Sequence, residues 1–142
     1  MICLFAILSL SYLPSSSLES RFEICEEIVD ASIKKDVDPV LSVGIALEES
    51  RLSYVTSPRG AIGPMQILEK YWCKTQPQNC NPIEAGVRAI SYFLKKYKGS
   101  EFNAVRSYAG RGARARRYAV RVLARVDRIR EQVKIFDDLF SY

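Results

Sequence analysis

Residues 38–66 read Asp38-Pro-Val-Leu-Ser-Val-Gly-Ile-Ala-Leu-Glu-Glu-Ser-Arg-Leu-Ser-Tyr-Val-Thr-Ser-Pro-Arg-Gly-Ala-Ile-Gly-Pro-Met-Gln66. Asp38 can accept hydrogen bonds from the free N–H groups of a first helical turn, and proline suits the position after it, so a helix is predicted over Pro39–Leu52. That helix is mostly apolar and is therefore expected to be buried on most sides. It nevertheless ends near two adjacent carboxylates, Glu48 and Glu49.

A carboxyl group at the end of a buried helix suggests acid–base chemistry. Desolvation favours the neutral form, and a neutral glutamic acid can protonate a glycosidic oxygen near neutral pH. Nearby residues suit a ligand cleft, because Gly60 and Gly63 permit positive φ and the Gln66 amide can both donate and accept. Taken alone, however, a Glu-Glu pair is more typical of a solvated last helical turn.

The complete string is more specific than its parts. Glu49-Ser50 followed by Ser57-Pro-Arg-Gly60-Ala61-Ile-Gly63-Pro-Met65-Gln66 closely resembles the signature of the soluble-type lytic transglycosylases, whose domain has a lysozyme-like fold. The resemblance spans roughly Glu23 to Leu123. Further matches in the family's order are Val37-Asp38-Pro39, Ala85-Gly86-Val87-Arg88, Tyr92-Phe93-Leu94 and Ser107-Tyr108-Ala109-Gly110.

The resemblance implies that Glu49 is the catalytic acid, because the family motif places this acid directly before Ser. Adjacent helical residues point about 100° apart, so Glu48 is expected to pair with Arg51 or to face solvent. Glu49 would protonate the oxygen between N-acetylmuramic acid and N-acetylglucosamine, then take a proton from the muramic acid C6 hydroxyl. The product is a 1,6-anhydro sugar. The substrate's acetamido group stabilises the cation in this family, so a second carboxylate, a metal and a cofactor are not implied.

Three further positions match family residues that line the sugar cleft, namely Ser57, Gln66 and Tyr108. Their hydroxyl and amide groups would fix substrate acetamido and hydroxyl groups, and the Tyr108 hydroxyl would hold the Glu49 carboxyl. Structural readings stay open, since Ser57 suits a turn, Gln66 a helix cap and Tyr108 core packing. Residues expected to shape the cleft are Gly60, Gly63 and Met65.

The chain also departs from the family pattern. Ala109 stands where the family usually has Asn after the Tyr, so the hydrogen bond from that amide is missing. Arg114 stands where the family's Glu-Thr-Arg-x-Tyr-Val run begins with Glu. Pro64 and the Leu68-Glu69 pair are atypical as well. These differences indicate a divergent member, with an altered cleft or lower activity.

The chain of 142 residues, 48% hydrophobic and 26% charged, has the size and composition of one globular domain. Few segments alternate with period two, so the expected fold class is all-α. Residues 1–17 are interpreted as an apolar leader or signal peptide, and residues 18–142 as the lysozyme-like catalytic domain with a basic C-terminal helix. The expected helices are Leu18–Lys35, Pro39–Leu52, Gly63–Trp72, Pro82–Lys98, Glu101–Tyr108 and Ala113–Asp137.

The leader interpretation rests on the apolar run Ile2–Leu13 and the small residues after it. It predicts export to the periplasm, cell envelope or exterior, although no Lys or Arg precedes the run, which leaves an uncleaved anchor, a truncated start or a buried helix open. Cys73 and Cys80 bracket a polar loop that a disulfide would close. Cys3 would leave with the leader, and Cys25 is expected to remain a buried free thiol.

The chain is basic, with a formal net charge of +5 and nine arginines between Arg106 and Arg130. Besides peptidoglycan glycan strands, this charge favours anionic wall or envelope polymers as partners. Nucleic acid is a weaker alternative, because no nucleic-acid motif is present. Two other functions stay open: a lysozyme-type hydrolase, and a catalytically weak wall-binding or assembly protein serving a phage or a secretion apparatus.

Overall fold

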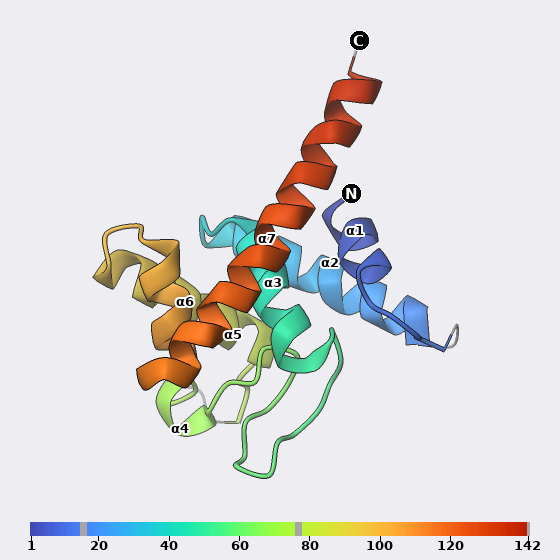
Figure 1. Ribbon diagram of the computed structural model, residues 1–142. Helices are drawn as coiled ribbons and strands as arrows, with labels where there is room; N and C mark the ends of the chain where they lie inside the picture. Colours follow the sequence, from blue (N-terminus) through green and yellow to red (C-terminus); the bar gives the residue numbers. More distant parts are fainter. Residues whose placement is uncertain (15–16, 76–77, 142) are drawn as a thin grey trace.

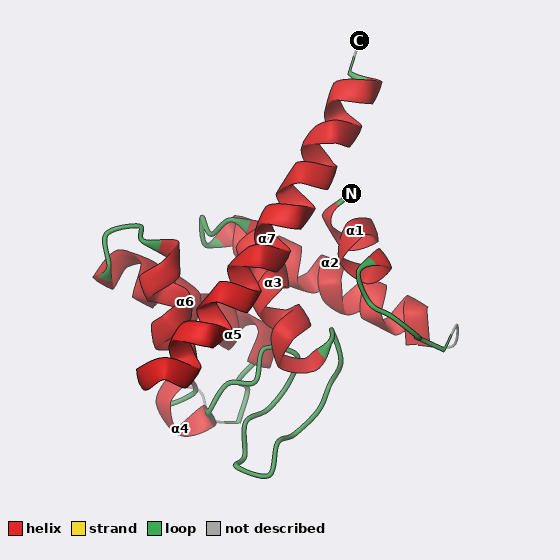
Figure 2. Ribbon diagram, in the orientation of Figure 1, coloured by secondary structure: helices red, strands yellow, loops and turns green. Residues whose placement is uncertain are grey.

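A computed structural model describes residues 1–14, 17–75 and 78–141. Within these ranges the chain is helical with no strand, as predicted; Thr56, Ile62 and Ile67 form only isolated backbone bridges. None of the described helices is both long and apolar enough to cross a membrane. The helices are α1 Ile2–Leu8, α2 Leu18–Lys34, α3 Pro39–Ser50, α4 Glu69–Trp72, α5 Pro82–Lys96, α6 Glu101–Ala109 and α7 Gly112–Phe140 (Figures 1 and 2).

Helix α3 is the core of the molecule, as its apolar sequence predicts. Every residue from Val40 to Leu47 is buried, and the helix packs against both α2 and α7. Its first turn is capped by Asp38, whose Oδ1 accepts a hydrogen bond from the Val40 N–H at 2.9 Å. Gly44 allows a close crossing with α7, because a Cβ at this position would lie 2.5 Å from Val126 Cγ2.

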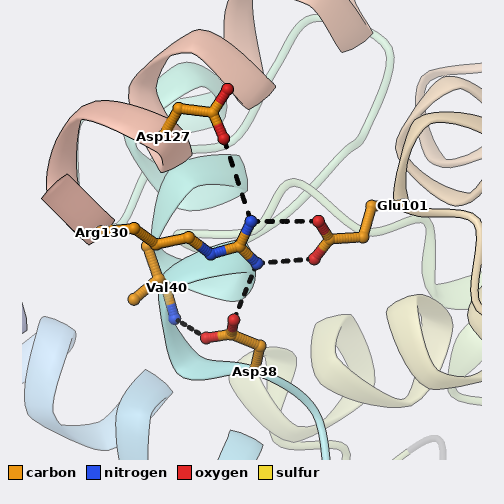
Figure 3. A network of polar contacts seen from close by, with 5 residues as sticks. All are labelled: Asp38, Val40, Glu101, Asp127 and Arg130. Carbon is orange, nitrogen blue, oxygen red and sulfur yellow. Dashed lines mark hydrogen bonds and ion pairs between the residues drawn. The ribbon is translucent and has the colours of Figure 1, made fainter.

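Helix α7 crosses the body of the molecule, and its C-terminal part extends beyond it (Figure 1). One side chain, Arg130, ties three elements together (Figure 3). Its guanidinium lies 2.7 Å from Asp38 Oδ2 before α3 and binds Glu101 at the start of α6 through two nitrogens, at 3.1 and 2.7 Å. The cap of the central helix is therefore fixed to α6 and α7.

The helix predicted over Gly63–Trp72 is wrong in its first half, since α4 covers only Glu69–Trp72. Gly63 has φ 74° and Gln66 has φ 51°, and both values lie in the left-handed region that interrupts a right-handed helix. Ile62 and Ile67 instead exchange two backbone hydrogen bonds, at 2.9 and 3.1 Å. Residues 63–67 therefore form a tight turn, and its Pro64 carbonyl accepts a hydrogen bond from Ser50 Oγ at the end of α3, at 2.6 Å.

The N-terminal apolar segment is a packed helix. α1 contacts α2, α3 and α7, with Cys3 and Ala6 buried. Cys3 forms a disulfide with Cys25, with Cα atoms 5.7 Å apart, so Cys25 is buried but is not the free thiol that we expected. The prediction of a free Cys25 was wrong because Cys3 had been assigned to a cleaved leader and was therefore not considered as its partner. A second disulfide joins Cys73 and Cys80. Ser15 and Ser16, in the expected cleavage segment, lie outside the described residues.

Candidate active site

Glu49 lies in the last turn of α3, where a half-buried carboxyl group faces a cavity of about 350 Å³. The helix ends directly after it, because Arg51 and Leu52 adopt left-handed φ values of 55° and 60°. The chain then runs into the loop that returns to α4. The cavity is lined by Glu48, Glu49, Arg59, Ala109, Arg111, Arg114, Ala115, Tyr118 and Arg121.

The two adjacent carboxylates have different surroundings. Glu48 does not pair with Arg51 and is not solvated, contrary to both expectations: its oxygens bind Arg121 Nε at 2.6 Å and Arg125 Nε at 3.2 Å. Arg51 instead donates to the Ser11 carbonyl at 2.8 Å. Helix α7 thus holds Glu48 through two arginines, whereas Glu49 has no ion pair within the described residues.

The surroundings of Glu49 favour its protonated form. Burial raises the pKa of this carboxyl, and the neighbouring negative charge of Glu48 raises it further. The hydroxyl of Tyr118 acts in the opposite direction and lowers the pKa, since it lies close enough to interact with the carboxyl. That hydroxyl is buried and has no partner in full hydrogen-bond geometry among the described side chains.

Tyr108 lies near Glu49 but is hydrogen-bonded elsewhere. Its hydroxyl donates to the Met65 carbonyl at 2.6 Å. Burial and the charge of Glu49 both raise the pKa of Tyr108 well above its usual range, so the hydroxyl stays protonated and keeps donating. In this structure the Tyr108 hydroxyl therefore supports the turn at Met65, and it is the Tyr118 hydroxyl that lowers the pKa of Glu49. The role of Tyr108 in binding sugar stays a prediction.

The loop residues expected to bind substrate are engaged with the loop itself. Ser57 Oγ accepts a hydrogen bond from the Ala61 N–H at 3.0 Å and closes the turn that contains Gly60, where φ is 86°. Gln66 Nε2 donates to the carbonyls of Val55 and Gly63, at 2.9 and 3.0 Å. Its amide oxygen accepts no hydrogen bond from a described residue and can therefore accept one from a ligand. The roles of Ser57 and Gln66 in binding sugar stay predictions.

The floor of the loop is held by close packing. Met65 is fully buried, and a Cβ added to Gly86 of α5 would lie 2.6 Å from its Cβ and Sδ atoms. A Cβ on Gly63 would lie 2.7 Å from Cβ of Pro82. Glycine at positions 63 and 86 thus lets the loop lie directly on α5.

A second cavity, of about 580 Å³, borders the Glu49 cavity and shares Ala109 with it. Its wall is aromatic, and the Trp72 ring packs edge-to-face with Tyr92 and Phe93, with centroids 5.8 Å apart in both pairs. Flat aromatic surface bordered by polar groups suits a sugar ring. The lining residues are Gln66, Ile67, Leu68, Tyr71, Trp72, Tyr92, Phe93, Ser107, Tyr108, Ala109 and Gly110.

The model of one protein family, the transglycosylase SLT domain, matches residues 26–125. The chain belongs to the SLT-domain family. This membership assigns it the lysozyme-like all-helical fold, cleavage of glycosidic bonds as its general activity and peptidoglycan as its substrate. No curated protein and no solved structure matches the chain significantly.

Sequence reasoning missed two parts of this SLT domain's site. Tyr118 lies in the segment Arg114–Ala119, which was compared with the family's C-terminal motif. It precedes the core residue Val122 by four positions and so lies on the inner face of α7, and this spacing could have identified it. Trp72 lies in a four-residue helix between loops, where no periodic pattern marks it. In residues 1–14, 17–75 and 78–141, no three His, Cys, Asp or Glu side chains cluster in a way that could hold a metal ion.

Proposed function

We propose that the chain is a peptidoglycan lytic transglycosylase in which Glu49 is the only acid and base. The observation that supports this most strongly is the pair of carboxylates at the end of α3. Glu48 is the other acidic residue lining the cavity, and Arg121 and Arg125 already bind it. A hydrolase of the usual kind needs a second carboxylate as nucleophile or base across the sugar. A transglycosylase uses the substrate's acetamido group instead.

The proposed reaction takes two steps. Protonated Glu49 donates its proton to the glycosidic oxygen, the bond from that oxygen to muramic acid C1 breaks, and the acetamido oxygen stabilises the cationic C1. The resulting Glu49 carboxylate then removes the C6 hydroxyl proton while O6 bonds to C1. The raised pKa of Glu49 suits the first step, since the carboxyl must begin protonated.

Neighbouring groups are suited to positioning. The Tyr118 hydroxyl would orient the Glu49 carboxyl, and the aromatic cavity with the Gln66 amide oxygen would hold the sugars next to it. The two disulfides, Cys3–Cys25 and Cys73–Cys80, support an exported protein, because such bonds persist in oxidising compartments. Burial of Cys3 supports retention of α1 after export, and intact-mass measurement of exported protein tests this.

A wall-binding protein with little turnover is the second candidate, and a specific residue favours it. Arg114, which stands where the family has Glu, lines the Glu49 cavity together with Arg59, Arg111 and Arg121. This positive charge would attract anionic wall material without promoting the chemistry. Such a protein would sediment with purified sacculi and release no soluble muropeptides.

Digestion of sacculi in H₂¹⁸O tests the proposal directly. A transglycosylase releases muropeptides with 1,6-anhydro ends and no ¹⁸O, since water does not enter the product. A hydrolase adds one ¹⁸O to each new reducing end. Mass spectrometry separates these products, and a ¹⁸O-labelled reducing end as the main product would replace our proposal with a lysozyme-type mechanism.

A further inference from the structure

A third cavity, of about 510 Å³, lies between the end of α6, the start of α7 and α5. Four of its lining side chains are cationic, Lys96, Arg106, Arg111 and Arg116, and none is acidic. These four form no ion pair within the described part of the chain. We call this space the basic cavity.

The cations of the basic cavity have no counter-charge among its lining residues. Like charges that share one cavity repel, and arginines at the start of α7 also oppose the positive end of its helix dipole, where the first turn has no acidic residue. Further along α7, Arg121, Arg125 and Arg130 each bind a carboxylate of the same chain, whereas Arg128 and Lys134 are exposed and form no ion pair within the described residues. The four cations of the basic cavity differ from these two because they line one cavity that has no acidic lining residue, which indicates a site for an anion.

The basic cavity borders the proposed substrate cleft. It shares Phe93, Ser107 and Gly110 with the aromatic cavity, and Arg111 with the Glu49 cavity. A group attached to a sugar in the cleft would therefore lie close to the basic cavity. Its volume suits an extended substituent of a few residues.

We infer that the basic cavity binds the carboxylates of the peptide attached to muramic acid in the substrate. This inference rests on the proposed function, which places the glycan beside Glu49. The peptide is joined to the lactyl group of the sugar that the cleft binds, so its carboxylates enter the cavity together with the glycan. The charge of a phosphate-bearing polymer would also suit the arginines, and the competition experiment below separates the two ligands.

Binding by a variant that does not turn over tests the inference separately from the proposed function. Glu49→Gln is incubated with two soluble glycan preparations of equal chain length, one with peptides and one from which an amidase has removed them. We expect the peptide-bearing glycan to bind about tenfold more tightly. Adding Arg106→Gln and Arg116→Gln should reduce this preference to less than about threefold.

The matched control removes two cations elsewhere on α7, Arg128 and Lys134, which line none of these three cavities and are exposed. Arg128→Gln with Lys134→Gln should keep the tenfold preference. If the variant with both Arg106→Gln and Arg116→Gln folds poorly, Arg116→Gln alone is a milder substitution at an exposed site.

Equal binding of the two glycans by Glu49→Gln, or the same loss of preference in the control variant, would overturn the inference. Competition by inorganic phosphate but not by free stem tripeptide would instead assign the cavity to phosphate polymers. A preserved preference without anhydro products from the unmodified protein would refute the proposed function alone.

Discussion

Arg121 Nε on α7 lies 2.6 Å from Glu48 Oε1 on α3, although the two residues are 73 positions apart in the chain. This ion pair, with the one from Arg125, binds the first of two adjacent carboxylates that line the cavity, and the second forms no ion pair within the described residues. The different surroundings of Glu48 and Glu49 are therefore produced by the packing of α7. The proposed chemistry depends on this arrangement.

Replacing Glu48 by Gln should shift the pH dependence of activity toward acid. Glu48 raises the pKa of Glu49, and its removal also leaves Arg121 and Arg125 without their partner beside the cavity. Both effects lower the pKa of Glu49, so the proton donor is lost at a lower pH. The alkaline limb of kcat/KM against pH is the measurement. Glu131→Gln on the distal part of α7 is the charge-matched control, and an unmoved limb in Glu48→Gln would contradict this account.

Replacing Glu49 by Gln should stabilise the protein at neutral pH. The folded-state pKa of Glu49 lies above its ordinary value of 4.5, so the folded chain holds the proton more tightly than the unfolded chain. Stability from this group is complete below pH 4.5 and declines as pH rises through the raised pKa. Gln carries no titratable proton, so its contribution to stability does not decline with pH. Thermal unfolding at pH 4 and 7 should show that Glu49→Gln raises the melting temperature, and more so at pH 7 than at pH 4. A higher melting temperature only at pH 4 would mean that the pKa of Glu49 is lowered, not raised, by folding.

Replacing Tyr118 by Phe should reduce activity more than stability. The hydroxyl is buried without a partner in full hydrogen-bond geometry, so its removal should change unfolding free energy by less than about 1 kcal/mol. Activity should fall by about tenfold, mainly in kcat, because the Glu49 carboxyl loses its orienting group. The alkaline limb should move to higher pH, since this hydroxyl lowers the pKa of Glu49. Unchanged kcat and an unmoved limb would restrict Tyr118 to packing.

Replacing Arg130 by Gln should destabilise the fold by about 1–2 kcal/mol, since charge-assisted hydrogen bonds to Asp38 and Glu101 are lost together. The side chain is 35% exposed, which limits the effect. Urea unfolding measures it, with Arg128→Gln as the control for loss of one positive charge on the same helix. Equal midpoints for the two variants would show that the network adds no stability.

The sequence predicted the parts of this molecule that depend on local pattern. Pro39 after Asp38 marked the start of the central helix, and the string around Glu49 identified the family. Contacts between distant segments could not be predicted from local pattern. The arginines that bind Glu48 come from α7, and the disulfide partner of Cys25 lies in α1. The turn after Gly63 was missed because a left-handed φ at Gln66 is set by the returning loop and not by residue type.

Release of anhydro-muropeptides from sacculi by the unmodified protein and by Glu49→Gln tests the central claim most directly. The account predicts 1,6-anhydro products from the unmodified protein and a rate lower by about 10²–10⁴-fold for Glu49→Gln, with Glu131→Gln close to the unmodified rate. Anhydro products released by Glu49→Gln at the unmodified rate would show that another group supplies the proton.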